Sequence, residues 1–326
     1  MSAEKAIIIC TRGSALALAQ SDMIAAECRR LFPSLRFDLK IIKTTGDKLQ
    51  KASMAKVEGG LPKGLFTKEL EVALAANEAD IAVHSLKDLP TELPAGLVLA
   101  ATPKREDVRD VLIYRASRPA GESTQRGLKP DSKLQDFPKG ATIATSSTRR
   151  KAQLLAARPD LNIVEIRGNV STRMQKVADR DELDATVLAL AGLTRLKFTI
   201  SPDGKIHGDA VPDSLLAAVL DLEVMLPAVG QGAIGLEIRS DDARISKICE
   251  SLNHRETFQC VSAERAFLAG MGGGCQSPVA AYGEILDDKI SLRAISFANG
   301  PMRRAEGNRP VKEAAELGQQ LAAKLK

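Results

Sequence analysis

A single cysteine in a glycine-rich stretch is the residue best placed to do chemistry. Cys275 lies in GMGGGCQSPV, residues 270–279, where four of the five preceding residues are glycine. A cysteine can serve packing, metal binding or the reactions of its sulfur. Glycines offer no side chain to pack on the thiol and leave room beside it, so the stretch favours a sulfur that carries a bulky group. Cys10, Cys28 and Cys260 lie in apolar segments and are predicted to be packing residues.

Basic side chains follow almost every predicted strand of the chain. They are Arg12, Lys87, Arg149, Arg150, Arg167, Arg173 and Arg195. In open α/β sheets, ligands bind beyond the carboxyl ends of the strands, where helix N-termini supply free N–H groups. Arginine matches a carboxylate with two parallel hydrogen bonds. A solvated basic face is the plainer alternative, but the repetition at strand ends favours a cleft for an acidic ligand.

Lys87 and Asp88 stand in HSLKDLP, residues 84–90, where the chain leaves an apolar strand. One interpretation is a turn or a helix cap, which aspartate favours. The other is a carboxylate that stabilises positive charge as it develops on a substrate. The residues alone leave both open, although a single acid in a basic cleft would be electrostatically distinct.

The sequence disfavours nucleotide binding, metal binding and nucleic-acid stacking. GQGAIG, residues 230–235, fits the dinucleotide fingerprint, but a proline-containing segment precedes it and strand-like alternation follows, so nucleotide binding is rejected. The five cysteines form no CxxC pair and the three histidines (His84, His207 and His254) lie far apart, which argues against a metal. Aromatic residues make up only 3% and Trp is absent, which argues against a stacking platform for nucleic acid.

Length and charge bound the architecture. A chain of 326 residues predicts two or three domains. No apolar run approaches a membrane span or a signal-peptide core, so a cytoplasmic protein without a membrane partner is expected. The net charge of +5 is mild and no polybasic tail carries it. It therefore predicts a bound anion rather than a nucleic-acid partner.

The elements that must position these residues form two similar units and a different tail. The first unit, residues 5–85, alternates strands and helices around a long loop at 45–64. The second unit, residues 141–190, repeats the order, which predicts an α/β fold with parallel sheets and two lobes around a cleft. The tail begins with a helix at 257–270 and predicts a small α+β domain with a hairpin turn at Asp287-Asp288.

Seven motifs together resemble one known family. They are TRGSALALAQ, KGLFTKELEVAL, DIAVHSLKDLP, TSSTRRKAQL, RGNVSTR, LPAVGQGAIGLE and GGGCQSPV. In this order, from residue 5 to about residue 300, they are similar to the hydroxymethylbilane synthases, also called porphobilinogen deaminases. The resemblance implies two lobes of the periplasmic-binding-protein kind and a small α+β domain with a three-stranded antiparallel sheet. The implied domains are residues 1–103 with 233–250, residues 109–226, and residues 255–326.

The resemblance also implies an activity. The family consists of transferases that join four porphobilinogen molecules head to tail, with loss of ammonia, and release linear hydroxymethylbilane by hydrolysis, in tetrapyrrole and haem biosynthesis. Their primer is a dipyrromethane cofactor held by a thioether to a cysteine that maps onto Cys275. Porphobilinogen is the implied small-molecule partner, and a monomer is expected. The alternative is a non-catalytic two-lobe protein that binds or senses a small anion, which explains the arginines but gives Cys275 no task.

The resemblance assigns roles residue by residue. Asp88 maps onto the catalytic aspartate. The residues that map onto the cofactor site are Cys275, Ser85, Lys87, Asp88, Thr145, Ser146, Ser147, Arg149, Arg150 and Arg173. Those that map onto substrate binding are Arg12, Ser14, Gln20, Phe66, Arg167, Arg173, Arg195 and Gln231. Residues 45–64 map onto a mobile lid, where GGLPKG is longer than the family pattern and leaves the role of Lys63 open.

Overall fold

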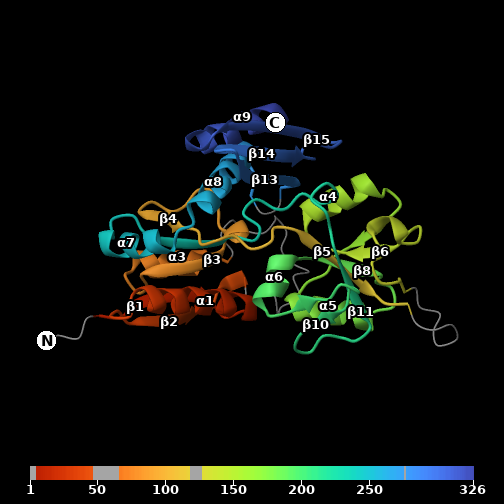
Figure 1. The fold of residues 1–326 in the computed structure, drawn as a ribbon, viewed down its shortest axis with the longest axis horizontal. Helices are drawn as coiled ribbons and strands as arrows, with labels where there is room; N and C mark the ends of the chain where they lie inside the picture. The colour runs from red at the N-terminus through yellow and green to blue at the C-terminus, as the bar shows by residue number, and fades with distance from the viewer. Residues whose placement is uncertain (1–4, 47–65, 118–126, 275–276) are drawn as a thin grey trace.

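The computed structural model describes residues 5–46, 66–117, 127–274 and 277–326. Two α/β lobes lie side by side, and a smaller α+β part sits above the junction between them (Figure 1). The predicted fold class, two lobes plus a small C-terminal part with a three-stranded antiparallel sheet, is confirmed.

The first lobe is built on a five-stranded sheet with the strand order β2-β1-β3-β12-β4. Helices α1 and α7 pack on one face and helix α3 on the other, so each face has its own apolar core. The strands are β1 (Ile7–Arg12), β2 (Phe37–Ile42), β3 (Ile81–Ser85), β4 (Leu97–Ala101) and β12 (Ile234–Arg239). The helices are α1 (Ala15–Leu31), α3 (Lys68–Ala75) and α7 (Ala243–Leu252).

The second lobe repeats this plan with the strand order β11-β5-β8-β6-β7. Helices α5 and α6 cover one face of the sheet and α4 covers the other. The strands are β5 (Asp110–Arg115), β6 (Thr142–Ala144), β7 (Asn162–Val164), β8 (Ala185–Ala189) and β11 (Leu215–Val219), with a small hairpin of β9 (Thr199–Ile200) and β10 (Ile206–His207). The helices are α4 (Thr148–Ala157), α5 (Val170–Asp179) and α6 (Leu190–Arg195).

The prediction of parallel sheets was wrong in part, because both sheets are mixed. Strand β1 pairs in parallel with β2 and β3, as the alternation of strands and helices predicts. Strand β12, however, is antiparallel to both β3 and β4, since the chain returns to the first sheet only after building the second lobe. In the second sheet β5 is likewise antiparallel to β8 and β11.

The third part is a three-stranded antiparallel sheet covered by two helices. Its elements are α8 (Arg255–Gly270), β13 (Val279–Leu286), β14 (Lys289–Ser296), β15 (Arg303–Pro310) and α9 (Ala314–Leu325). The predicted hairpin turn at Asp287–Asp288 is confirmed, because both residues have positive φ angles of 47° and 58°, as a two-residue hairpin turn needs.

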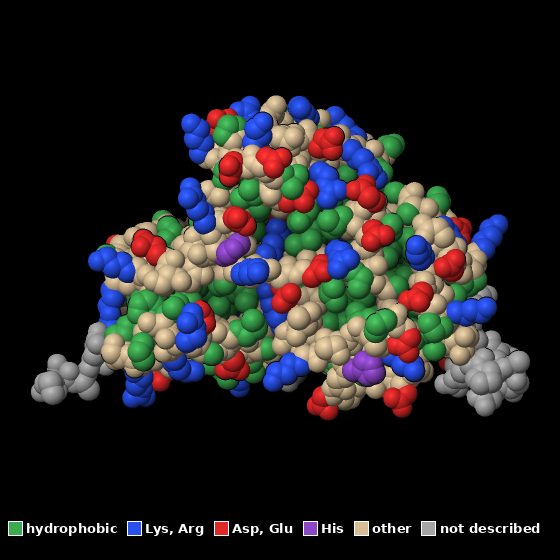
Figure 2. Space-filling view, in the orientation of Figure 1, with side chains coloured by type: hydrophobic (Ala, Val, Ile, Leu, Met, Phe, Trp, Pro, Cys, Tyr) green, Lys and Arg blue, Asp and Glu red, His purple; other side chains and the backbone are tan. Residues whose placement is uncertain are grey.

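The three parts meet where two crossover segments run between the lobes. The outgoing segment is residues 102–109 and the returning segment is residues 220–233. The amide of Glu106 on the outgoing segment donates to the carbonyl of Gly232 on the returning one. Glu264 of α8 lies between them, fully buried, and accepts both terminal nitrogens of Arg105 at 2.6 and 3.0 Å and the Gly230 amide at 2.8 Å. Figure 2 shows Lys and Arg side chains in the hollow between the lobes and under the third part.

Candidate active site

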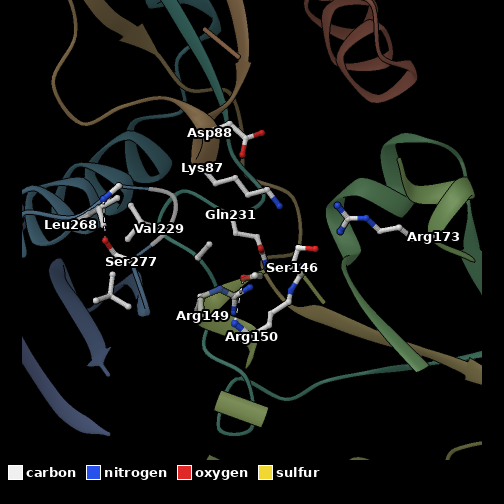
Figure 3. A pocket seen from close by; sticks show the side chains of 14 residues that line it. Lys87, Asp88, Ser146, Arg149, Arg150, Arg173, Val229, Gln231, Leu268 and Ser277 are labelled. Atoms are coloured by element: carbon white, nitrogen blue, oxygen red, sulfur yellow. Dashed lines mark hydrogen bonds between the residues drawn. The ribbon is translucent and has the colours of Figure 1, made fainter. Parts of the chain in front are cut away.

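Two adjoining cavities form one cleft between the lobes. The first has a volume of about 290 Å³ and the second about 530 Å³, and Lys87, Asp88, Arg150 and Arg173 line both. Figure 3 shows how the first is assembled: Lys87 and Asp88 come from the first lobe, Ser146, Arg149, Arg150 and Arg173 from the second, and Leu268 and Ser277 from the third part. The cleft lies beyond the carboxyl ends of β1, β3, β6 and β8, where anionic ligands bind in open α/β sheets.

Three helices of the two lobes begin at this cleft. The Ser14 hydroxyl caps α1 by accepting the Ala17 amide, Ser147 caps α4 through the Arg150 amide, and Asn169 caps α5 through the Thr172 amide. The three caps line one cavity or the other. Because the N-terminus of a helix carries partial positive charge and unpaired N–H groups, the cleft attracts anions before any charged side chain is counted.

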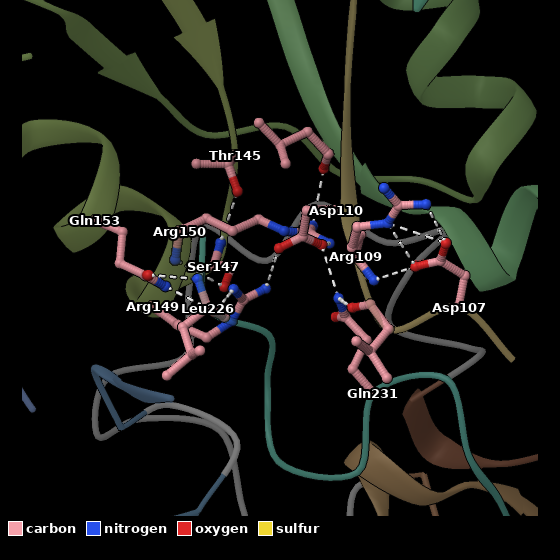
Figure 4. Close-up of polar contacts among 12 residues, drawn as sticks. Asp107, Arg109, Asp110, Thr145, Ser147, Arg149, Arg150, Gln153, Leu226 and Gln231 are labelled. Carbon is pink, nitrogen blue, oxygen red and sulfur yellow. Dashed lines mark hydrogen bonds and ion pairs between the residues drawn. The ribbon is translucent and has the colours of Figure 1, made fainter. Parts of the chain in front are cut away.

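A buried aspartate holds two of the predicted arginines in place. Asp110 accepts Nη2 of Arg149 on Oδ2 at 2.8 Å and Nη2 of Arg150 on Oδ1 at 2.6 Å, while Gln231 Nε2 donates to Oδ1 at 2.9 Å (Figure 4). Burial alone would raise the pKa of Asp110, but the charges of Arg149 and Arg150 hold it well below its usual range. One carboxylate thus neutralises only one of two guanidinium charges.

Both arginines keep a donor for which the described residues offer no acceptor. Arg149 and Arg150 are 4% and 6% exposed, and each spends its other terminal nitrogen on a backbone carbonyl, of Leu226 and Val187. The Nε atom of each is buried and, among the described residues, has no acceptor. A buried donor without an acceptor is unfavourable by roughly 1–3 kcal/mol, so both Nε atoms are suited to donate to an anion that enters the cleft.

Three further cations of the cleft are desolvated. Burial lowers the pKa of Lys87 to about 8, although the charges of Asp88 and Asp110 partly oppose the shift. Burial also lowers the pKa of Arg173 to about 10, with Arg150 adding to the effect, and that of Arg195 to about 10. Such shifts mean that positive charge is held where too little negative charge compensates it, which an anionic ligand would reverse.

Asp88 is the acid of the first cavity. It closes a short 3-10 turn, Leu86–Asp88, that follows β3, and Leu86 anchors the turn in the apolar core. The returning crossover segment packs closely against this turn at Gly230. This glycine has φ +71°, and a Cβ atom there would lie 3.2 Å from the Lys87 amide nitrogen. Among the described residues no hydrogen bond or ion pair holds the Asp88 carboxylate, and in Figure 3 it faces the cavity alone.

The loop that carries Cys275 borders the same cavity. Gly274 and Ser277, which flank it on either side, line the first cavity together with Asp88, and the Gly274 amide donates to the Ser277 hydroxyl at 3.1 Å. Cys275 itself lies outside the described residues. The other cysteines are buried, as predicted for Cys10, Cys28 and Cys260, and burial raises the pKa of the Cys260 thiol to about 12.

The second cavity gathers most of the residues predicted to bind substrate. Arg12, Ser14, Phe66, Arg173 and Arg195 line it, together with Ser85 of the predicted cofactor site. The guanidinium of Arg12 stacks on the Phe66 ring with 4.2 Å between its Cζ atom and the ring centroid, a cation–π contact that fixes both side chains at the rim. Arg195 donates to the Gly232 carbonyl at 2.6 Å, which ties the second lobe to the returning crossover.

Three of the predicted site residues line neither cavity. Gln20 is buried behind the site, where its amide exchanges hydrogen bonds with the Ser85 hydroxyl at 2.9 and 3.1 Å. The Thr145 hydroxyl accepts the Ser147 amide, and Arg167 is exposed beside Glu165. Their roles stay predictions, as does that of the loop 45–64, of which residues 47–64 lie outside the described residues.

Sequence reasoning missed two residues that shape the site. Asn169 had a readable signal, because an asparagine three residues before Thr172 at the start of a helical pattern is an N-cap signature. Asp110 had none: it opens a fully buried strand, and only the fold brings it to Arg149 and Arg150. Among the described residues no group of three or more His, Cys, Asp or Glu side chains could hold a metal ion.

Comparison with known proteins identifies the family. The family model described as "Porphobilinogen deaminase, dipyromethane cofactor binding domain" matches residues 7–247, and "Porphobilinogen deaminase, C-terminal domain" matches residues 258–326. The porphobilinogen deaminase of Chlorobaculum tepidum is 43% identical, over 99% of this chain and 95% of its own length. That of Desulforudis audaxviator is also 43% identical, over 98% and 94%. None of the helices in the described residues has the length and apolar character to span a membrane. The chain belongs to the porphobilinogen deaminase family.

Proposed function

We propose that this chain is a hydroxymethylbilane synthase. It condenses four porphobilinogen molecules head to tail with loss of ammonia on a dipyrromethane primer, and then releases linear hydroxymethylbilane by hydrolysis. The family to which it belongs supports the reaction and the cofactor. Cys275 is proposed as the point of thioether attachment and Asp88 as the catalytic aspartate.

One observation carries the assignment of these two residues. The residues on both sides of Cys275 line the same cavity as Asp88, although they come from the third part and the first lobe and are 186 positions apart in the chain. The described neighbours of Cys275 therefore share one small cavity with the Asp88 carboxylate and a group of cations, which supports a role for the thiol at this cavity. A protein that merely binds a small anion would need the cations but neither the loop nor the acid.

The described residues fit the cofactor. Each pyrrole ring of dipyrromethane bears an acetate and a propionate, so the primer presents four carboxylates. Four cationic side chains line the first cavity, namely Lys87, Arg149, Arg150 and Arg173. The buried Nε donors of Arg149 and Arg150 have no acceptor among the described residues, and burial depresses the pKa of Lys87 and of Arg173. When bound, the primer supplies a pyrrole ring with a free carbon that accepts the next ring.

The second cavity is proposed to bind the incoming porphobilinogen. Arg12, Arg173 and Arg195 offer guanidinium groups to its two carboxylates, and the N-terminus of α5 beside Arg173 adds backbone N–H groups. Phe66, held by Arg12, offers an apolar face to the pyrrole ring. Because Lys87, Asp88, Arg150 and Arg173 border both cavities, the two pyrrole systems meet at Asp88.

Asp88 acts where positive charge develops. When ammonia leaves the protonated aminomethyl group of porphobilinogen, the carbon–nitrogen bond breaks with its electron pair on nitrogen, and the positive charge passes to the remaining pyrrole fragment. Every other charged side chain that lines the first cavity within the described residues is itself a cation and would oppose this step. A fixed carboxylate beside the fragment stabilises it, which is worth about 10²–10³ in rate for one well-placed electrostatic group.

The mass of the intact chain tests the attachment. The purified wild-type chain is expected to exceed its sequence mass by one dipyrromethane and to gain further ring units on incubation with porphobilinogen. Cys275→Ser should show the sequence mass alone and no turnover, whereas Cys260→Ser, which changes a buried thiol, should keep the primer. An unmodified wild-type mass in active protein, or full turnover by Cys275→Ser, would overturn the assignment.

The proposal also covers the assembly. One chain supplies Asp88 and the cations that the proposed reaction uses, so we propose a monomer that acts on a small molecule in the cytoplasm, without nucleic-acid or membrane partner. Light scattering of the loaded enzyme during turnover tests this, and activity confined to a dimer fraction would contradict it.

A further inference from the structure

One face of helix α8 packs against the turn that carries Asp88. Residues at helical spacing form this face, namely Val261, Glu264, Arg265 and Leu268. Val261 is buried in an apolar cluster with Leu86 and Leu89, on either side of Asp88. Residues three and four positions apart lie on the same side of a helix, so the charged pair in the middle of this face must also meet the first lobe and the crossovers.

The guanidinium of Arg265 donates hydrogen bonds to the backbone carbonyls directly after Asp88. Its Nη1 donates to the Leu89 carbonyl at 3.0 Å, and its Nη2 donates to the carbonyls of Pro90 at 2.6 Å and Thr91 at 3.3 Å. Pro90 has no N–H and cannot tie this segment down through its own backbone donor. A rigid guanidinium fork from another part of the molecule supplies the anchor instead.

The contacts of Arg265 differ from those of its neighbour Glu264. Glu264 binds Arg105 and the amides of Gly230 and Gly283, and so joins the crossovers to the third part. Among the described residues Arg265 binds three carbonyls and no carboxylate, and burial lowers its pKa to about 10 although the charge of Glu237 opposes the shift. A desolvated cation that holds backbone carbonyls is a costly way to stabilise a fold, which points to a function in placing this segment.

The same helix leads into the loop of Cys275. Leu268, one turn beyond Glu264, lines the first cavity, and α8 ends at Gly270, four residues before Gly274 of the cavity wall. The helix therefore contacts the segment directly after the Asp88 turn at Arg265, and its C-terminal end leads to Gly274 of the cavity wall. Figure 3 shows Leu268 and Ser277 of the third part on one side of the cavity and Asp88 on another.

We propose that Arg265 is a positioning residue that holds the Asp88 turn against helix α8, so that the acid stays at the ring that accepts the next porphobilinogen. The inference rests on the proposed roles of Asp88 and Cys275. Arg265 acts through the backbone of residues 89–91 and does not itself line either cavity. A displacement of the acid by about 1 Å is enough to reduce the rate ~10²-fold.

Three variants test the proposal in the loaded enzyme. Arg265→Ala removes the fork, Arg265→Lys keeps the charge without the fork, and Arg255→Ala removes an exposed arginine from the first turn of the same helix as a control. Arg265→Ala is expected to carry the primer but to lose roughly 10–10² in kcat, with KM changed less than about threefold. Under limiting porphobilinogen its mass spectrum should show chains stalled after the first added rings. Arg265→Lys should recover part of the rate, and Arg255→Ala should behave as wild type.

A double-mutant cycle separates positioning from mere stability. If Arg265 acts by placing Asp88, then Arg265→Ala should reduce the rate of an Asp88→Asn enzyme by less than about threefold, because coupled residues are not additive. An equal loss in both backgrounds, or wild-type kcat in Arg265→Ala, would overturn the inference. If Arg265→Ala does not fold, the same cycle with Arg265→Lys decides. A wild-type chain without the primer would instead refute the proposed function, so the two failures are distinguishable.

Discussion

Two aspartates of the cleft have opposite surroundings: Asp88 of the first lobe lines the first cavity, and Asp110 of the second lobe binds Arg149 and Arg150 of its wall. Asp110 is fully buried and its two oxygens accept Arg149, Arg150 and Gln231. Asp88 is half-buried, lines both cavities, and receives no hydrogen bond from the described residues. In one cleft, therefore, one aspartate holds arginines in place and the other faces the cavity.

The difference shows how a basic cleft can be both stable and reactive. A buried pair of guanidinium groups would be strongly unfavourable without a counter-charge, so Asp110 makes the pair possible and sets its geometry. Because Asp110 is saturated by its partners, it has little capacity left for a ligand. Asp88 has no hydrogen-bond partner among the described residues, so its carboxylate can fill its proposed role of stabilising a positive charge on substrate.

The largest expected effect comes from Asp110→Asn, which tests the structural half of the comparison. The substitution leaves Arg149 and Arg150 buried without an anion, and breaking a buried ion pair in this way costs about 3–5 kcal/mol. Urea unfolding should show this loss in free energy most clearly in a Cys275→Ser background, where no primer carboxylates compensate. Asp209→Asn, an exposed carboxylate at the second cavity, is the matched control and should stay within ~0.5 kcal/mol of the parent. A stable Asp110→Asn would show that the arginines do not depend on it.

The same substitution at Asp88 should have the reverse outcome. Asp88→Asn removes no hydrogen bond that the described residues make, so the free energy of unfolding should change by less than about 0.5 kcal/mol. The rate of ring addition should fall by about 10²–10³ because the developing cation loses the one carboxylate that the described residues place in the first cavity. Single-turnover addition of porphobilinogen, followed by intact mass, measures it. A rate within a few-fold of wild type would remove the distinction between the two aspartates.

The contrast between these residues also marks what the sequence could predict. Asp88 could be found because it follows an apolar strand in a motif of the family and because strand ends of an α/β sheet form the site. The arginines followed the same rule, and Arg12, Arg149, Arg150, Arg173 and Arg195 do line the cleft. Periodicity placed α1, α5 and α8 within about two residues of their observed ends.

The rest depended on contacts between distant parts of the chain. Asp110 reaches Arg149 and Arg150 across about 40 positions, and Arg265 reaches Leu89 across 176. No local pattern encodes such pairs, because each segment reads only as a buried strand or an amphipathic helix. The antiparallel entry of β12 was missed for the same reason: a strand's own residues do not record which neighbours it pairs with.

The smallest expected effect is a pH dependence at Lys87, whose burial-lowered pKa is partly restored by the charges of both aspartates. Burial lowers the pKa of Lys87 to about 8, against an ordinary value of 10.5, while the charges of Asp88 and Asp110 oppose the shift. Between these two values the unfolded chain binds more protons at Lys87 than the folded one. The unfavourable contribution of the charged lysine is therefore fully present below pH 8, and the primer-free Cys275→Ser protein should become more stable as the pH rises from about 8 to 10.5.

Anion binding reverses the sign of this dependence. Carboxylates in the cavity favour the charged lysine, so ligand binding takes up a proton, and kcat/KM should fall above about pH 8 by at most roughly tenfold per pH unit, as for one titrating group. Lys87→Met should flatten this limb, whereas Lys151→Met, an exposed lysine on α4, should leave it unchanged. A limb that survives in Lys87→Met would assign the titration to another group. In that case Lys87 would not be the group through which the charges of Asp88 and Asp110 influence the pH dependence of the rate.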